Sequence, residues 1–397
     1  MHLSPWPCFD EEAIQIVAEV LRSGRVNQWT GDHVSRFEVE YARYVGCPHA
    51  VAVANGTVAL ELALEALDIG AGDEVIVPCR TFVATATAVI MRGAVPVFAD
   101  VDADSQTLTV ETAALALSPR TKAVIAVHLA GWPCPLHDLR TFCDSHGLRL
   151  IEDCAQAHGA RIHDAPVGSI GDASAFSFCQ DKIISTGGEG GMLIAQTQDT
   201  AERAWSFKDH GRDYDMALSE SDFSAGYRWL TTRVGTNWRM TEMQAALGRH
   251  YLAKLDDSVG ARRRHADRLR QEFQDCRVLR LPPVPPHVYH SYYRFYTFVR
   301  PHALRTGWNR NRLWNELNRH GLDVGTGACP EVYREPIFAH VRYPDGITRD
   351  LRPAAPLPVA RDLGETTLMF QVHPNLTEHE IDSIADITLK ILRAARR

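Results

Sequence analysis

The sequence predicts an α/β protein with a mostly parallel sheet, and three observations lead to that prediction. Short apolar runs typical of strands alternate with segments of helical periodicity between residues 49 and 153. Polar residues and glycines follow the ends of these runs, where open parallel sheets bind their ligands. The chain has 397 residues, of which 45% are hydrophobic, and this is enough for two domains.

The predicted elements follow one another in a regular order. Because helices connect successive strands, we expect right-handed crossovers and parallel strands. After residue 153 the pattern changes to short strands linked by glycine-rich turns. The predicted strands are 49–54, 74–78, 95–101, 123–129, 148–153, 173–178 and 192–195, and the predicted helices are 57–67, 82–92, 136–146, 201–208 and 240–255.

A second domain is expected in the C-terminal part of the chain. The basic helical run at 260–273 and the proline cluster at 282–286 mark the passage into it. We predict a large domain over residues 1–250 and a small α/β domain over residues 251–397, with the N-terminal segment as a candidate to pack on the small domain. The predicted elements of the small domain are a strand at 292–299 and helices at 309–319 and 378–392.

Composition excludes several classes of protein. The formal net charge of −7 argues against a nucleic-acid-binding protein, which usually carries a basic patch. Nine cysteines form no CxxC pair, a pattern that fits reduced thiols better than disulfides or a zinc site. No signal peptide and no apolar run of about 18 residues is visible. We therefore expect a soluble cytoplasmic protein.

A lysine and an aspartate carry the clearest chemical signal. Lys182 lies between the apolar run 176–178 and the glycine cluster 187–191, a setting that favours burial over the solvated position usual for a loop lysine. Asp153 ends a predicted buried strand, which is costly unless the carboxylate meets a cation or serves as a structural helix cap. A Schiff-base lysine and a carboxylate that holds a pyridinium nitrogen are what pyridoxal phosphate (PLP) chemistry requires.

Other strand ends could complete such a site. Gly56 and Thr57 offer backbone amides, a hydroxyl and a helix N-terminus to an anion, although a plain turn is the more common reading of such a sequence. Phe82 could stack on a flat ring or pack under the following helix. Gln156 could hydrogen-bond the phenolic oxygen of the cofactor. The glycine cluster matches neither a Walker loop nor a dinucleotide fingerprint, which argues against a Rossmann reductase.

Taken in order, these motifs carry a family resemblance. The chain resembles the DegT/DnrJ/EryC1/StrS aminotransferases, PLP enzymes that aminate keto-sugars, usually nucleotide-linked ones. The similarity covers nearly the whole length, and its motifs are highly specific in this order and spacing. They lie at residues 29–31, 36–38, 55–57, 72–78, 81–85, 96–101, 152–159, 176–178, 182, 235–240 and 357–360.

The resemblance implies the type I PLP aminotransferase fold and a role for each catalytic residue. Lys182 would form the Schiff base with PLP and act as the base for the proton shift. Asp153 would pair with the pyridine nitrogen and keep it protonated. Gln156 would contact the ring oxygen.

The same resemblance implies the cofactor-binding residues and the assembly. Gly56, Thr57 and Ser177 would bind the phosphate, and Phe82 would stack on the ring. Asn237 would reach the phosphate from the neighbouring subunit. The implied assembly is therefore a homodimer with shared active sites.

The implied reaction moves an amino group from L-glutamate or L-glutamine to a keto-sugar, in amino-sugar, lipopolysaccharide or antibiotic biosynthesis. A carrier-free eight-carbon ulosonic acid and a cyclitol ketone, scyllo-inosose, stay open as acceptors. Sugar 3-dehydratases of this fold replace the lysine with histidine, so Lys182 argues against that activity. A non-catalytic regulator would be expected to lose Lys182, Asp153 or Gln156, and all three are present.

Two departures from the commonest family pattern bear on the substrate. The residues before the lysine are Cys179, Gln180 and Asp181, where many relatives carry others, and residues 186–189 differ from several subgroups by a residue. The irregular stretch at 211–236 is predicted to be a loop over a site or interface, and its Arg212–Val234 portion looks long for the family. Such loops commonly shape the acceptor pocket, so neither the sugar nor its carrier follows from the sequence.

Overall fold

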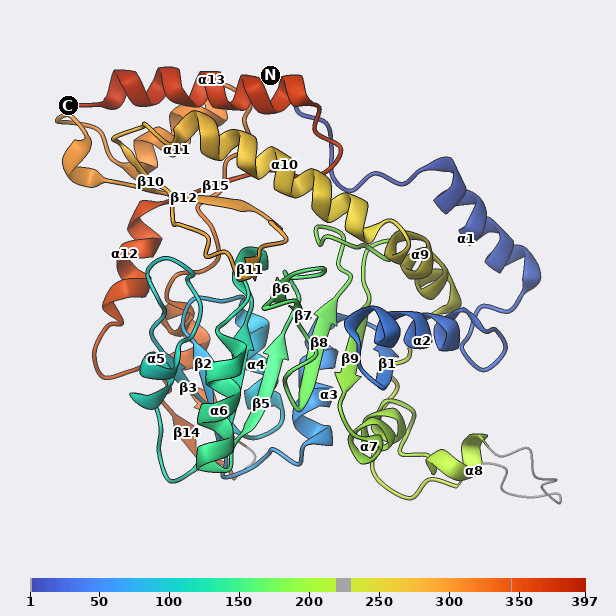
Figure 1. Ribbon diagram of the computed structural model, residues 1–397. Helices are drawn as coiled ribbons and strands as arrows, with labels where there is room; N and C mark the ends of the chain where they lie inside the picture. The colour runs from blue at the N-terminus through green and yellow to red at the C-terminus, as the bar shows by residue number, and fades with distance from the viewer. Residues whose placement is uncertain (1, 219–229, 344) are drawn as a thin grey trace.

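The computed structural model describes residues 2–218, 230–343 and 345–397. Figure 1 shows a large region built around a seven-stranded sheet and a smaller region that holds the C-terminal helices. Both ends of the chain lie in the smaller region, near α13 (Glu378–Ala395). Among the described residues, no helix combines the length and apolar character that a membrane crossing needs. The predicted loop at 211–236 lies partly outside the described residues, which omit 219–229.

The main sheet confirms the prediction of a mostly parallel arrangement. Its strand order is β1-β9-β8-β5-β4-β2-β3. Five of these strands form a parallel set, and only β9 runs antiparallel to both of its neighbours. The strands are β1 (His49–Val53), β2 (Glu74–Pro78), β3 (Val95–Ala99), β4 (Thr121–Val127), β5 (Arg149–Asp153), β8 (Ala173–Ser177) and β9 (Gly191–Ala195).

Helices cover both faces of this sheet, which explains why its strands are apolar throughout. Side chains alternate between faces, so Val75 and Val77 join the core under α3, α4 and α7 whereas Ile76 joins the core under α5 and α6. The helices of this region are α1 (Glu11–Ser23), α2 (His33–Val45), α3 (Gly56–Ala66), α4 (Val83–Met91), α5 (Val110–Ala114), α6 (Leu136–His146), α7 (Gln198–Lys208), α8 (Tyr214–Leu218) and α9 (Glu242–Leu252).

The smaller region packs two long helices against a three-stranded antiparallel sheet. Its core contains Phe273, Phe295 and Phe370, and Leu3 from the N-terminal segment packs against the same core. The elements are α10 (Leu255–Phe273), β10 (Leu279–Arg280), β12 (Phe295–Val299), α11 (Arg310–Arg319), β15 (Thr367–Phe370) and α13. Short paired strands complete the described structure: β6 (Arg161–Ile162), β7 (Ala165–Pro166), β11 (Val288–Tyr289), β13 (Val341–Arg342) and β14 (Thr348–Arg349).

Several predicted boundaries differ from the observed ones for local reasons. The strand predicted at 123–129 ends at Val127, because Ala130 takes a left-handed conformation (φ 59°) in the following 3-10 turn. The strand predicted at 292–299 begins only at Phe295, since Tyr292 has φ 48°. The helix predicted at 240–255 is α9, which ends at Leu252, and the helical run predicted at 260–273 begins earlier, at Leu255, as α10.

Two carboxylates join motifs that lie far apart in the sequence. Asp100, at the end of β3, accepts hydrogen bonds from the backbone amides of Val359 and Ala360, both at 2.9 Å, and so caps α12 (Pro358–Thr366). Glu242 accepts from the amides of His33 and Val34, at 2.7 and 3.1 Å, at the start of α2. Each contact places a negative charge at a helix N-terminus, where it is stabilising.

The C-terminal half does not pack only on itself. Tyr296 and Phe298 of β12 belong to the same hydrophobic core as Val75 and Val77 of β2. The domain boundary near residue 250 therefore stays a prediction.

Candidate active site

Asp153 is a buried carboxylate at the end of β5. Its Oδ2 accepts a hydrogen bond from the Thr85 hydroxyl at 2.9 Å, and its Oδ1 accepts one from the Ala155 amide at 3.2 Å. Among the described residues, no lysine or arginine nitrogen lies within 4.0 Å of it. Burial raises the pKa of Asp153 above its usual value. A protonated ring nitrogen would supply the missing cation.

Lys182 follows β8 in the turn that leads to β9. Its amide donates to the Cys179 carbonyl at 3.0 Å, and only 16% of its side chain is exposed. The amine Nζ lies 3.4 Å from an Asp181 oxygen and 5.0 Å from the centre of the Tyr293 ring. The lysine is thus held in a largely enclosed position, as its sequence context predicts.

The turn after β1 meets the end of β8 at very close range. A Cβ atom on Gly56 would lie 2.5 Å from the Cβ of Ser177, so only glycine fits there. The Asn55 side chain caps α3 by accepting from the Val58 amide at 3.0 Å, while Thr57 is exposed in the first turn of that helix. Ser177 accepts from the Cys179 amide at 3.3 Å. The end of β8, with Ser177, thus lies against the N-terminus of α3, where an anion would be stabilised.

The remaining predicted residues occupy different settings. Phe82 precedes α4 with 66% of its surface exposed, so it does not pack under that helix. Gln156 is fixed by a hydrogen bond from the Ala130 amide to its Oε1, at 2.8 Å. Asn237 is exposed and pairs through its backbone with Asp209. Its role toward a neighbouring subunit stays a prediction.

The structure adds residues that the sequence reasoning missed. Thr85 bonds Asp153 and is bonded in turn to the Thr81 hydroxyl at 2.8 Å. His158 lies beneath Ser177, donating from Nε2 to its carbonyl at 2.8 Å and accepting from the Tyr41 hydroxyl at 2.7 Å.

A sequence signal existed for some of these residues. The two threonines are four residues apart at a predicted helix start, a spacing that places them on one face. His158 is part of the 152–159 motif, although nothing in that motif identifies its partner. Tyr293, which donates to Asp181, could not be found because it lies far away in the chain.

A buried cluster near the site has the residue types of a metal centre but not the free ligand atoms. His128 Nε2 lies 3.0 Å from Glu152, and its Nδ1 accepts from the Cys134 amide. Glu152 also accepts from the amides of Gly168, Ile170 and Gly171. Burial alone would raise the pKa of Glu152, but the His128 contact and these amides hold it below its usual value. The cluster is structural.

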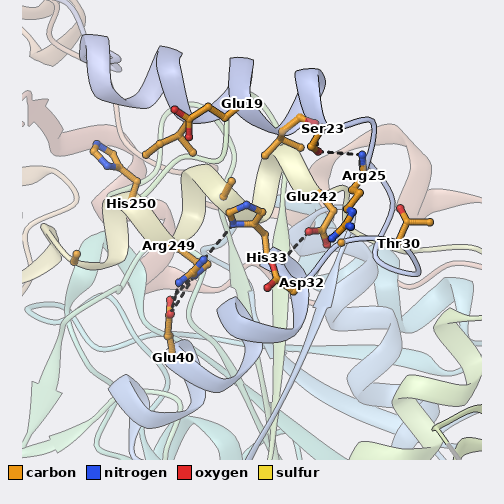
Figure 2. Close-up of a pocket in the computed structure, with 15 residues that line it drawn as sticks. Glu19, Ser23, Arg25, Thr30, Asp32, His33, Glu40, Glu242, Arg249 and His250 are labelled. Atoms are coloured by element: carbon orange, nitrogen blue, oxygen red, sulfur yellow. Dashed lines mark hydrogen bonds and ion pairs between the residues drawn. The ribbon is translucent and has the colours of Figure 1, made fainter. Parts of the chain in front are cut away.

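A cavity of about 720 Å³ between α1, α2 and α9 is also separate from the site. Figure 2 shows its charged lining, in which Arg249 pairs with Glu40 and lies beside His33. None of the predicted site residues lines it.

The arrangement around Lys182 fits PLP. Within the described part of the chain, the buried carboxylate has no lysine or arginine nitrogen within 4.0 Å, Phe82 at the start of α4 is exposed, and Gly56 lets the start of α3 lie close to Ser177. Together with the α/β fold, these features fit a PLP-dependent enzyme.

Comparison with known proteins gives the family. A profile of the DegT/DnrJ/EryC1/StrS aminotransferase family matches residues 7–388. The chain therefore belongs to this family, whose members are PLP-dependent sugar aminotransferases, as the motifs predict.

Individual relatives agree over most of the chain. An aminotransferase from Psychrobacter cryohalolentis superposes with a TM-score of 0.94 and 43% identity, covering 99% of each chain, which confirms the type I PLP aminotransferase fold. GDP-perosamine synthase from Vibrio cholerae is 39% identical over 267 residues, or 67% of this chain and 69% of that protein. UDP-N-acetyl-3-dehydro-alpha-D-glucosamine 3-aminotransferase from Acidithiobacillus ferrooxidans is 34% identical, covering 91% of this chain and 89% of that protein.

Proposed function

We propose that this enzyme transfers the amino group of L-glutamate to a keto-sugar linked to a nucleotide. The observation that carries the proposal is an enclosed Lys182 and a buried Asp153 at the ends of the neighbouring strands β8 and β5, with no lysine or arginine nitrogen of the described residues within 4.0 Å of Asp153. The acceptor class is supported by relatives whose names specify a GDP-linked and a UDP-linked sugar. We further propose a cytoplasmic homodimer.

Each residue has a defined task in this proposal. PLP, when bound, supplies an electron-accepting ring next to the reacting carbon. Lys182 Nζ takes the proton from that carbon and returns it on the cofactor side. Asp153, oriented by Thr85, holds a proton on the ring nitrogen. Gln156 contacts the ring oxygen.

The phosphate-binding tasks fall to the cradle between β1 and β8. Gly56 lets the backbone approach the phosphate, and Thr57 and Ser177 donate hydroxyl hydrogen bonds. Phe82 covers the ring face. Asn237 completes the phosphate site of the neighbouring subunit.

The first experiment is a visible absorption spectrum of the purified protein with PLP, before and after L-glutamate. We expect a band from bound cofactor that disappears on addition of glutamate as 2-oxoglutarate forms. Lys182→Ala should abolish this band, while Lys122→Ala, which removes an exposed lysine on β4, should leave it unchanged. A protein that binds no PLP, or whose band ignores both glutamate and glutamine, would disprove the proposed donor reaction.

The acceptor is tested separately with enzyme that has already reacted with glutamate. GDP-, UDP- and dTDP-linked keto-sugars should restore the original band, with amino-sugar as product. Restoration only by an oxidised eight-carbon ulosonic acid or by scyllo-inosose would replace the nucleotide-linked acceptor with a carrier-free one.

A further inference from the structure

Two buried arginines converge on one backbone carbonyl close to Lys182. Arg262 comes from α10 and Arg294 from the residue before β12. Both donate from Nη1 to the carbonyl oxygen of Tyr293, at 3.3 and 3.2 Å. Their exposed fractions are 0% and 8%. Two like charges are therefore held together in the protein interior.

Neither arginine of this pair forms a close ion pair with a described residue. Among the residues that the structure describes, no carboxylate oxygen lies within 4.0 Å of either guanidinium. The Nε and Nη2 atoms of Arg262 have no hydrogen-bond partner at all. Burial and the neighbouring charge of Arg294 lower the pKa of Arg262 to about 9. A buried charge without a close ionic partner is costly, so this arrangement favours an anionic ligand.

The acidic residue Asp181, close to this arginine pair, already contacts Lys182. Asp181 lies 3.4 Å from Lys182 Nζ and accepts a hydrogen bond from the Tyr293 hydroxyl. The Tyr293 ring is shared by two cations, with Lys182 Nζ at 5.0 Å and the Arg294 guanidinium at 4.4 Å from its centre. The arginine pair therefore borders the reacting lysine. Asp181 attracts both arginines at longer range, but its ion pair within 4.0 Å is with Lys182.

A buried histidine beside the arginine pair also has a ring nitrogen without a hydrogen-bond partner among the described residues. His373 is 3% exposed, and its Nδ1 has no partner. Burial, together with the charges of Arg262 and Arg294, lowers the pKa of His373 to about 3, so its imidazole is neutral. Trp6 stacks on this imidazole and lies 4.9 Å from the Arg262 guanidinium, and its indole donates to the Lys182 carbonyl.

We propose that Arg262 and Arg294 form the binding site for the α-carboxylate of the amino donor. This inference rests on the proposed function. The donor must bring its amino group to Lys182, and its carboxylate is attached to the same carbon, so the anion site must border that lysine. The phosphate of PLP is assigned to the cradle at Gly56 and Ser177, and the pair has no contact with that cradle.

Ligand binding to the PLP-loaded protein tests this directly. 2-Oxoglutarate carries the required carboxylate but cannot react with PLP, because both are carbonyl compounds. We expect Arg294→Gln to raise its calorimetric dissociation constant about ten-fold or more, as for loss of a charge-assisted hydrogen bond. Arg294→Lys should retain part of the affinity, and Arg262→Gln should weaken binding if it folds.

Three controls separate the outcomes. Arg263→Gln removes a neighbouring arginine on α10 whose Nη1 bonds the His290 carbonyl, and it should bind 2-oxoglutarate as the wild type does. PLP affinity should be the same in all variants. Unchanged affinity of Arg294→Gln for 2-oxoglutarate would overturn the carboxylate assignment. So would a variant that loses affinity only for GDP and UDP, titrated in the same way. A wild-type protein whose band ignores glutamate would instead defeat the proposed function itself.

Discussion

At the scale of single residues, the structure shows that the key carboxylate is oriented by a hydroxyl rather than by a charge. Thr85 donates to Asp153 at 2.9 Å and is itself bonded to Thr81. This chain of hydroxyls fixes the carboxylate that we assign to the ring nitrogen of PLP. Thr85 is therefore a positioning residue, since it acts through Asp153.

Replacing Thr85 with valine should keep the shape of the side chain but remove its hydrogen bond. Hydrogen bonds to charged groups contribute about 1.5–3 kcal/mol, so we expect kcat to fall about ten-fold or more. The visible band of bound PLP should also shift, which a purely structural role would not cause. Thr85→Ser should restore both properties. Equal rates for valine and threonine would contradict the assignment.

At the scale of secondary-structure elements, the site depends on a close approach between the β1–α3 turn and the end of β8. Gly56→Ala would place a methyl group 2.5 Å from the Ser177 Cβ and 3.1 Å from its Cα. Because the backbone must then move apart, we expect PLP to bind about ten-fold more weakly. Gly70→Ala is the matched control, since its Cβ would meet only the Arg92 carbonyl at 3.4 Å. Fluorescence titration with PLP measures both.

The cap that Asp100 provides for α12 gives a second prediction at this scale. Asp100→Ala leaves the Val359 and Ala360 amides without their acceptor and should lower the free energy of unfolding by about 1–2 kcal/mol. Asp100→Asn should recover part of this loss, because an amide oxygen still accepts. Asp362→Ala, an exposed change on the same helix, should have little effect on urea denaturation. An Asp100→Ala protein as stable as the wild type would show that the cap is dispensable.

Features of the fold and the site could be predicted from the sequence where neighbouring residues determine them. The strands of the parallel set and the positions of Lys182 and Asp153 follow from apolar runs and the residues that end them. The ends of β4 and β12 could not be predicted, because they depend on positive φ angles at the non-glycine residues Ala130 and Tyr292. Contacts such as Thr85 with Asp153 are set only when distant segments pack.

At the scale of the whole molecule, stability should depend on pH through histidines that are buried in the neutral form. Burial lowers the pKa of His158 to about 4, and of His290 and His373 to about 3. Between about pH 6.5 and these folded-state pKa values, the unfolded chain binds protons that the folded chain does not. The contribution of these three histidines to stability is thus fully present above about pH 6.5 and is lost as the pH falls toward their folded-state pKa values. For His158 alone the loss is on the order of 3 kcal/mol.

Thermal denaturation at pH 7.5 and pH 5 measures this effect. We expect the wild-type Tm to fall at pH 5, and His158→Gln to show a smaller difference between the two conditions. His302→Gln, which changes an exposed histidine, should leave the difference as in the wild type. A His158→Gln protein whose Tm falls as far on acidification as that of the wild type would contradict the assignment of a neutral imidazole to His158.

The anchoring of the first residues has a consequence for synthesis on the ribosome. Ser4 bonds Glu380, and Trp6 stacks on His373 while its indole holds the Lys182 carbonyl. Ser4 and Trp6 leave the ribosome long before their partners His373 and Glu380 are made. The large sheet can form during translation. The contacts of Ser4 and Trp6 with these partners form only after residues 373–380 have been translated.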